Sequence, residues 1–119
     1  MDINQLSPCS VWQNFAEICA IPHASGNEKQ LSCFLMQKAE KMGFAVRQDA
    51  FYNLRIDRRE EVPGAPRILL QGHLDMVPQV VPGKVFDFEK DPVTPVIKGD
   101  FVYADGTTLG ADEIGRAHV

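Results

Sequence analysis

A histidine and an aspartate stand two residues apart in the segment 71–78, as His73 and Asp75. In an extended backbone, residues i and i+2 project to the same side about 6.5 Å apart, so the two side chains can converge on one point, or the carboxylate can orient the imidazole. Imidazole and carboxylate are zinc ligands, and a carboxylate often fixes the tautomer of a ligating histidine. The pair therefore predicts one corner of a metal site.

A second carboxylate, Asp112, ends a loop rich in glycine and threonine that begins at Asp105. Catalytic metal sites gather ligands from several loop ends, and Gly106 and Gly110 free the backbone on both sides of the two threonines. The alternative is structural: a lone His-x-Asp occurs by chance, a histidine that ends a strand is often a core residue, and the loop can be an ordinary turn. We favour the metal interpretation.

Two helices and two hairpins are predicted around these residues. Ser7 as N-cap and Pro8 as first helical residue begin a helix that ends before Ile21, and a second apolar stripe at helical spacing ends at Gly43. Alternating residues predict strands over 44–48 and 53–57 around a turn near Asp49, and a hairpin over 93–104.

The continuous apolar run over 67–71 is typical of a strand buried on both faces, and it is the best candidate for a central strand. His73 and Asp75 then lie at or just past its carboxyl end, where open α/β sheets place their sites. Such a short chain has too few strands to cover both faces of a sheet, so we also expect an unpaired edge, exposed apolar surface and poor solubility.

Composition excludes several classes of function. The chain has 119 residues and a net charge of −4, with no basic stripe, so nucleic acid is not an expected partner. No apolar run approaches the roughly 20 residues of a membrane span, and the N-terminus lacks the pattern of a signal peptide, so we expect a cytoplasmic protein without a membrane partner. The three cysteines, Cys9, Cys19 and Cys33, are expected to be buried thiols.

The motifs together resemble a known family. The string 70–79, LQGHLDMVPQ, is followed by residues 87–88, by 90–92 and by GTTLGAD at 106–112. This order closely resembles the N-terminal part of aminoacyl-histidine dipeptidases, the bacterial Xaa-His dipeptidases, which are dizinc exopeptidases of the aminoacylase- and carboxypeptidase-like group. The resemblance runs in order from residues 6–8, through 21–23 and 43–44, to Asp112.

The resemblance implies an α/β fold, with this chain as the N-terminal fragment of a zinc-exopeptidase-like catalytic domain that has a mixed sheet between helices. By analogy, His73 is a ligand of one metal ion, Asp75 is the catalytic-site carboxylate that clamps and polarises its imidazole, and Asp112 bridges the two ions. Nothing in the family pattern makes His23 a ligand.

The same resemblance implies two Zn²⁺ ions per site, with Co²⁺ or Mn²⁺ as alternatives, a dipeptide substrate of the aminoacyl-histidine type, and a parent enzyme that can be a homodimer. The family's acidic pair, which supplies the general base, and its later ligands have no counterpart in these 119 residues. We therefore expect the isolated chain to be catalytically inactive and to bind metal weakly.

The resemblance divides the chain into residues 1–112, the N-terminal part of the catalytic peptidase domain, and residues 113–119. Codons that can encode 113–119 match a sequencing-library adapter, so this stretch is expected to be a non-native tail; the alternative is a genuine divergent end with His118 as a replacement ligand. Two other interpretations stay open: a small non-catalytic α/β module in which His73 and Asp75 are structural, and a truncated partner of a full-length subunit.

Overall fold

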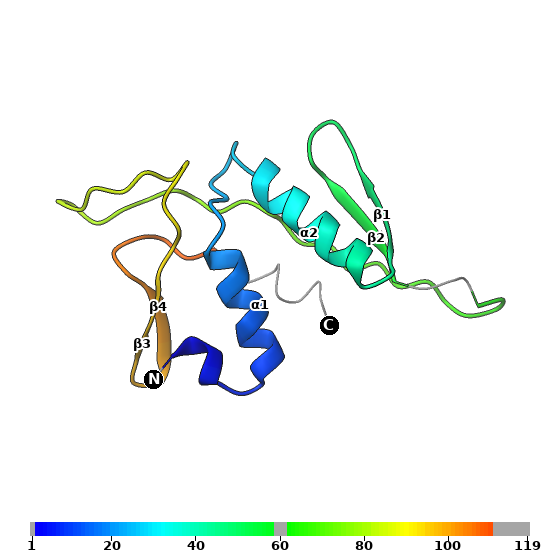
Figure 1. Cartoon of the computed structure of the whole chain (residues 1–119), viewed down its shortest axis with the longest axis horizontal. Coiled ribbons are helices and arrows are strands. Elements are labelled where there is room, and N and C mark those ends of the chain that lie inside the picture. The colour runs from blue at the N-terminus through cyan, green and yellow to red at the C-terminus, as the bar shows by residue number, and fades with distance from the viewer. Residues whose placement is uncertain (1, 59–61, 111–119) are drawn as a thin grey trace.

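The structure is a computed structural model, and it describes residues 2–58 and 62–110. A short 3-10 helix, η1 (Ile3–Gln5), is followed by two α-helices, α1 (Cys9–Cys19) and α2 (Lys29–Lys41). Two strand pairs, β1 (Ala45–Gln48) with β2 (Leu54–Asp57) and β3 (Pro95–Lys98) with β4 (Phe101–Ala104), lie toward opposite ends of an elongated molecule of 56 × 34 × 22 Å (Figure 1). Residues 62–94, which precede β3, contain no helix and no strand of these two pairs (Figure 1).

Both helices form where the apolar spacing predicts them. The start of α1 differs by one residue: Pro8 is in the N-cap position, and Ser7 instead offers its carbonyl oxygen to the Trp12 indole at 3.3 Å. The end of α2 is as predicted, since Gly43 has φ +85° and its N–H donates to the Glu40 carbonyl at 2.9 Å. The Phe44 N–H donates to the Ala39 carbonyl at 3.0 Å, which completes a Schellman motif.

The two predicted hairpins are confirmed. In the first, Val46 pairs with Ile56 in an antiparallel ladder, and the Asp49 carboxylate closes the turn by accepting the N–H groups of Phe51 and Asn53, both at 2.9 Å. In the second, β3 and β4 pair antiparallel around a turn at Gly99, which has φ +60°. The described residues thus contain two separate two-stranded sheets.

The core consists of two buried clusters, one on each side of α1. The first is formed by Ile18, Leu31 and Leu35, so it joins α1 to α2, and Leu74 packs against it. The second is formed by Cys19, Met76 and Val93, so it joins α1 to two segments that precede the second hairpin, and Ala104 at the end of β4 packs against it. Leu74 and Met76 therefore fix the segment that carries His73 and Asp75.

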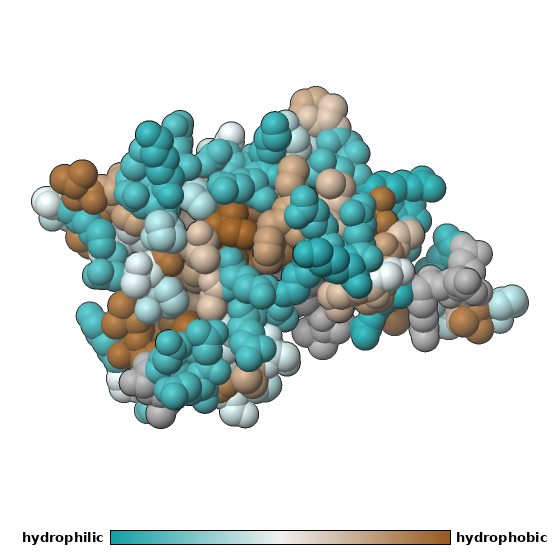
Figure 2. Space-filling view, in the orientation of Figure 1, coloured by the Kyte–Doolittle hydropathy of each residue, from teal (hydrophilic) through white to brown (hydrophobic). Residues whose placement is uncertain are grey.

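The prediction of a buried central strand over 67–71 is wrong for this structure. Ile68 and Leu69 are 83% and 88% exposed, and this segment joins no ladder among the described residues. A central strand is buried by neighbours on both edges and both faces, and the described part of the chain supplies neither. The predicted exposed apolar surface is confirmed, and Figure 2 shows further hydrophobic surface over β3 and β4.

Three other expectations can now be compared with the structure. The α/β class is confirmed, with helices packed against small antiparallel sheets. Cys19 is buried, which raises the pKa of its thiol to about 12, but Cys9 is exposed and Cys33 is half-buried, so the expectation of three buried thiols is wrong. Within the described residues, none of the helices has the length and apolar character that a bilayer crossing needs.

Candidate functional site

His73 and Asp75 lie on a segment whose alternate residues face the core. Leu74 packs against the first cluster and Met76 is only 3% exposed, whereas the side chains of His73 and Asp75 are 44% and 39% exposed. This is the period-2 alternation of an extended backbone, and it sends the two polar side chains to the same side although the preceding residues form no ladder. The predicted convergence is therefore observed.

The imidazole of His73 is held through Nδ1. This nitrogen lies 2.8 Å from the main-chain carbonyl oxygen of Asp75 and 3.4 Å from its carboxylate oxygen Oδ1. A carbonyl oxygen can only accept, so Nδ1 must carry the proton. The sequence predicted the carboxylate as the orienting group, and the structure adds the main-chain oxygen as the nearer partner.

The carboxylate of Asp75 has a partner 50 residues earlier in the chain. Ser25 Oγ donates to Asp75 Oδ2 at 2.5 Å, and this bond lowers the pKa of the carboxyl group, although partial burial opposes the shift. The proximity of His73 lowers the same pKa further. Asp75 is thus kept ionised, with one oxygen toward Ser25 and the other toward His73.

Ser25 is positioned by backbone pairing with the segment that carries the candidate ligand. The Met76 N–H donates to the His23 carbonyl and the Ser25 N–H donates to the Met76 carbonyl, both at 2.9 Å, in a parallel bridge. The chain then turns: the Asn27 N–H donates to the Ala24 carbonyl at 2.7 Å, and Gly26 has φ +88°. A positive φ at the third turn position is what a type II turn requires, which accounts for a glycine there.

The loop 105–110, rich in glycine and threonine, runs antiparallel to residues 77–81, which follow His73 and Asp75 in the chain. The Val81 N–H donates to the Gly106 carbonyl at 2.9 Å, and the Thr108 N–H donates to the Gln79 carbonyl at 2.9 Å. The Thr108 hydroxyl accepts from the Gln79 N–H at 3.1 Å and donates to the Val77 carbonyl. The loop is therefore pinned along residues 77–81.

This pairing brings Gly110 onto Met76. A Cβ atom at Gly110 would lie 2.4 Å from Met76 Cβ and 3.2 Å from Met76 Cα, so only glycine allows this approach. Gly110 is the last described residue, and Asp112 follows it by two positions in the sequence. Asp112, the tail 113–119 and His118 lie outside the described residues.

His23 is buried behind the same segment, at 2% exposure. Its Nδ1 lies 2.7 Å from the Ile21 carbonyl oxygen, and its Nε2 has no hydrogen-bond partner of good geometry among the described residues. Burial lowers its pKa, against the opposing influence of the Ile21 and Gly110 carbonyls and of Asp75. The His23 imidazole is therefore buried and neutral, and Ile21 holds it through Nδ1.

The described residues thus bring together one candidate metal ligand, His73, and the carboxylate of Asp75 beside it, and they contain no group of three or more potential ligands. The donor chemistry fits a metal ion, because a proton on Nδ1 places the lone pair of the imidazole on Nε2, the atom that would coordinate a metal. Sequence reasoning missed Ser25. No local signal could have found it, because its partner is 50 residues away.

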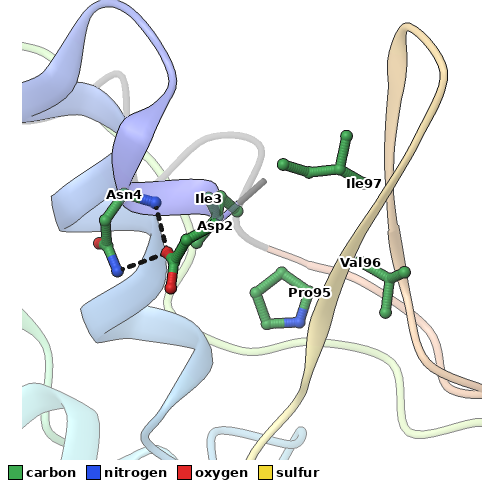
Figure 3. A pocket seen from close by; sticks show the side chains of 6 residues that line it. All are labelled: Asp2, Ile3, Asn4, Pro95, Val96 and Ile97. Carbon is green, nitrogen blue, oxygen red and sulfur yellow. Dashed lines mark hydrogen bonds between the residues drawn. The ribbon is translucent and has the colours of Figure 1, made fainter.

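A separate pocket of about 400 Å³ lies between η1 and β3, far along the chain from His73. Figure 3 shows Pro95, Val96 and Ile97 along one wall, and Asp2 on the other, where its carboxylate accepts the backbone and side-chain N–H groups of Asn4 at 2.8 and 2.9 Å. These bonds form the cap of η1. The polar side chain of Asp2 in this pocket therefore serves to cap η1. The pocket is lined by neither His73 nor Asp75, so it is not the candidate site.

Comparison with known proteins agrees with the motifs. No family model matches the sequence. It is 46% identical over 120 residues to the cytosol non-specific dipeptidase of Escherichia coli K12, an alignment that covers 98% of this chain and 24% of that relative.

The fold is similar to the crystal structure of aminoacylhistidine dipeptidase from Vibrio alginolyticus. The TM-score is 0.83 and the identity 42%, over 98% of this chain and 24% of that one. The chain therefore spans about a quarter of the length of the relatives it matches. In sequence and in fold it resembles part of the aminoacyl-histidine dipeptidases, as its motifs predict.

Proposed function

We propose that residues 1–112 are the N-terminal part of the catalytic domain of a metal-dependent dipeptidase. The observation that carries the proposal is the geometry of His73: its Nδ1 lies 2.8 and 3.4 Å from two oxygens of Asp75. This is the arrangement in which a histidine presents Nε2 to a metal ion. The similarity to two dipeptidases supports the reaction class.

In this proposal His73 and Asp112 hold the metal, and Asp75 orients His73. When bound, a pair of Zn²⁺ ions, or Co²⁺ or Mn²⁺, supplies Lewis-acid activation of water and of the peptide carbonyl. The residues of this chain position the ligands. Asp75 keeps the proton of His73 on Nδ1, and the loop 105–110, which is paired with residues 77–81, immediately precedes the segment that contains Asp112. In this proposal the general base and the remaining metal ligands are residues outside 1–112.

The substrate that we propose is a dipeptide, with aminoacyl-histidine preference, because one relative is named for that specificity and the other as a non-specific dipeptidase. A cytoplasmic location is supported by the name of the Escherichia coli relative. A homodimeric parent enzyme belongs to the same proposal. The isolated chain is inactive in it, because His73 and Asp112 are too few ligands for two ions.

A chimera tests the function directly. Residues 1–112 replace the matching quarter of the Escherichia coli relative, and hydrolysis of dipeptides, including aminoacyl-histidines, is measured with Zn²⁺ present. We expect the chimera to hydrolyse dipeptides, and His73→Ala in the chimera to lose activity by at least about 100-fold, as expected for the loss of a direct ligand.

The matched control is Gln71→Ala, an exposed residue two positions before His73 on the same segment. It should leave the rate of the chimera within about twofold. A folded chimera that hydrolyses dipeptides equally well with His73→Ala would contradict the proposal, and would favour the alternative in which His73 and Asp75 are structural.

A further inference from the structure

We infer that Ser25 is a positioning residue of the metal site: through its hydrogen bond to Asp75 it fixes the carboxylate that orients His73. The inference rests on the proposed function, since it concerns the same corner. It assigns a role to a residue in the turn 24–27, which is remote in sequence from both His73 and Asp75.

Ser25 restricts the rotation of the Asp75 carboxylate. The terminal torsion of an aspartate is broad, so a half-exposed carboxylate rotates unless an acceptor oxygen is held. Ser25 Oγ lies 2.5 Å from Asp75 Oδ2, and this contact sets the plane of the carboxylate. The other oxygen, Oδ1, then lies 3.4 Å from His73 Nδ1.

Ser25 itself is fixed. Its N–H donates to the Met76 carbonyl at 2.9 Å, and its hydroxyl lies 3.2 Å from the same oxygen. The next residue, Gly26, donates its N–H to the Glu28 carboxylate at 2.6 Å, which holds the turn from the other side. A hydroxyl on a restrained turn orients a partner at little further entropic cost.

The hydrogen bond from Ser25 is expected to strengthen metal binding by His73. The hydroxyl has one proton, and the shorter contact, to Asp75, takes it. The serine hydroxyl thus donates to the Asp75 carboxylate, whose other oxygen lies 3.4 Å from His73 Nδ1, and the main-chain carbonyl of Asp75 accepts from that Nδ1 at 2.8 Å. A proton on Nδ1 leaves the lone pair on Nε2, the atom that would coordinate a metal ion. Partners of this kind typically change metal affinity by about 10- to 100-fold.

The test compares Ser25→Ala with Ser25→Thr in this chain. The first readout is the tautomer of His73 in the metal-free protein, from the 15N chemical shifts of the imidazole. We expect Ser25→Ala to lower the ratio of the Nδ1–H to the Nε2–H form by about threefold, and Ser25→Thr to restore it, because threonine keeps the hydroxyl and position 25 is exposed enough for a methyl group.

The second readout is the dissociation constant for Zn²⁺, which Ser25→Ala should raise by about tenfold and Ser25→Thr should leave within about twofold. The matched control is Ser32→Ala. Ser32 is buried, and its hydroxyl donates to the Tyr52 carbonyl at 2.7 Å and accepts from Gln48 at 2.8 Å, so its loss weakens the fold without touching His73. Circular dichroism verifies that each variant is folded.

The results distinguish a failure of the role proposed for Ser25 from a failure of the proposed function. If Asp75→Asn shifts the tautomer and the Zn²⁺ affinity but Ser25→Ala changes neither, the inference is wrong and the proposed site stands. If His73→Ala leaves the Zn²⁺ affinity unchanged, the proposed function itself fails. If Ser25→Ala does not fold, Ser25→Cys, which keeps the volume but weakens the donor, must give the same direction of change, and no change there overturns the inference.

Discussion

At the scale of single residues, His23 provides a prediction about pH. Its burial lowers its pKa below the value of about 6.5 that histidine has in an unfolded chain. At pH values between these two, the unfolded state binds more protons than the folded state, so the free energy of unfolding falls as the pH falls through this window. Below the folded-state pKa of His23, this residue no longer makes the free energy of unfolding depend on pH.

Urea unfolding from about pH 7.5 to about pH 5 measures this effect, and His23→Gln should flatten the curve over the same range. The NMR titration of the His23 ring gives the folded-state pKa independently. A titration midpoint above that of free histidine would contradict the burial argument, because it would mean that the Ile21 and Gly110 carbonyls and Asp75 outweigh desolvation.

Asp75 is the second residue with a direct prediction. Asp75→Asn removes the charge beside His73 and places an amide where a carboxylate accepts, so the proton of the imidazole is no longer confined to Nδ1. In the chimera, we expect this change to lower metal affinity by about 10- to 100-fold, measured by competition with a chelator. An unchanged affinity would mean that the main-chain oxygen at 2.8 Å is sufficient to orient His73.

At the scale of elements, the pinned loop 105–110 depends on Gly110. A methyl group at this position would lie 2.4 Å from Met76 Cβ, and Met76 cannot yield because it is buried in the second core cluster. We expect Gly110→Ala to lower the free energy of unfolding by about 1–3 kcal/mol, measured in urea.

The control for Gly110 is Gly99→Asn in the turn between β3 and β4. Gly99 has φ +60° with open space around it, and asparagine tolerates that conformation, so this change should cost only a few tenths of a kcal/mol. Equal effects at the two glycines would show that steric approach to Met76 is not what selects Gly110.

Elements with local signals were predicted from the sequence. The two helices, the end of α2 at Gly43 and both hairpins depend on periodicity and turn residues that lie close together in the chain. The convergence of His73 and Asp75 is also local, because the period of an extended backbone is two. The position of Asp112 relative to them remains a prediction.

Nonlocal features were not predictable in the same way. The burial of residues 67–71 depends on neighbours that the described residues do not contain, so apolar composition alone gave the wrong environment for Ile68 and Leu69. The contact between Ser25 and Asp75 spans 50 positions and leaves no pattern in the sequence. Both depend on which segments meet, and periodicity carries no information about that.

At the scale of the whole molecule, the open shape is the main finding. The radius of gyration is 15.8 Å, against about 13 Å for a compact domain of this length. Ile68, Leu69 and Leu70 form a contiguous exposed apolar stretch, and exposed apolar surface of this kind favours association between molecules.

We therefore expect the purified chain to self-associate as its concentration rises. Leu69→Lys should reduce this association, as measured by size-exclusion chromatography with light scattering, because a charge in the exposed apolar stretch opposes its association with another chain. The control is Val85→Lys, since Val85 is 97% exposed but lies outside the stretch. A wild-type chain that stays monomeric over about a tenfold range of concentration would contradict the expectation.

In the proposed function, His73 ligates a metal ion through Nε2 while Asp75 holds Nδ1. The most direct measurement is a Zn²⁺ titration of the wild-type chain followed by the 15N chemical shifts of the His73 ring. The account predicts that Nε2 shifts on binding and Nδ1 stays protonated, even if the affinity of this isolated chain is weak. Zn²⁺ binding that leaves the His73 ring unshifted, or that shifts Nδ1 in place of Nε2, would contradict it.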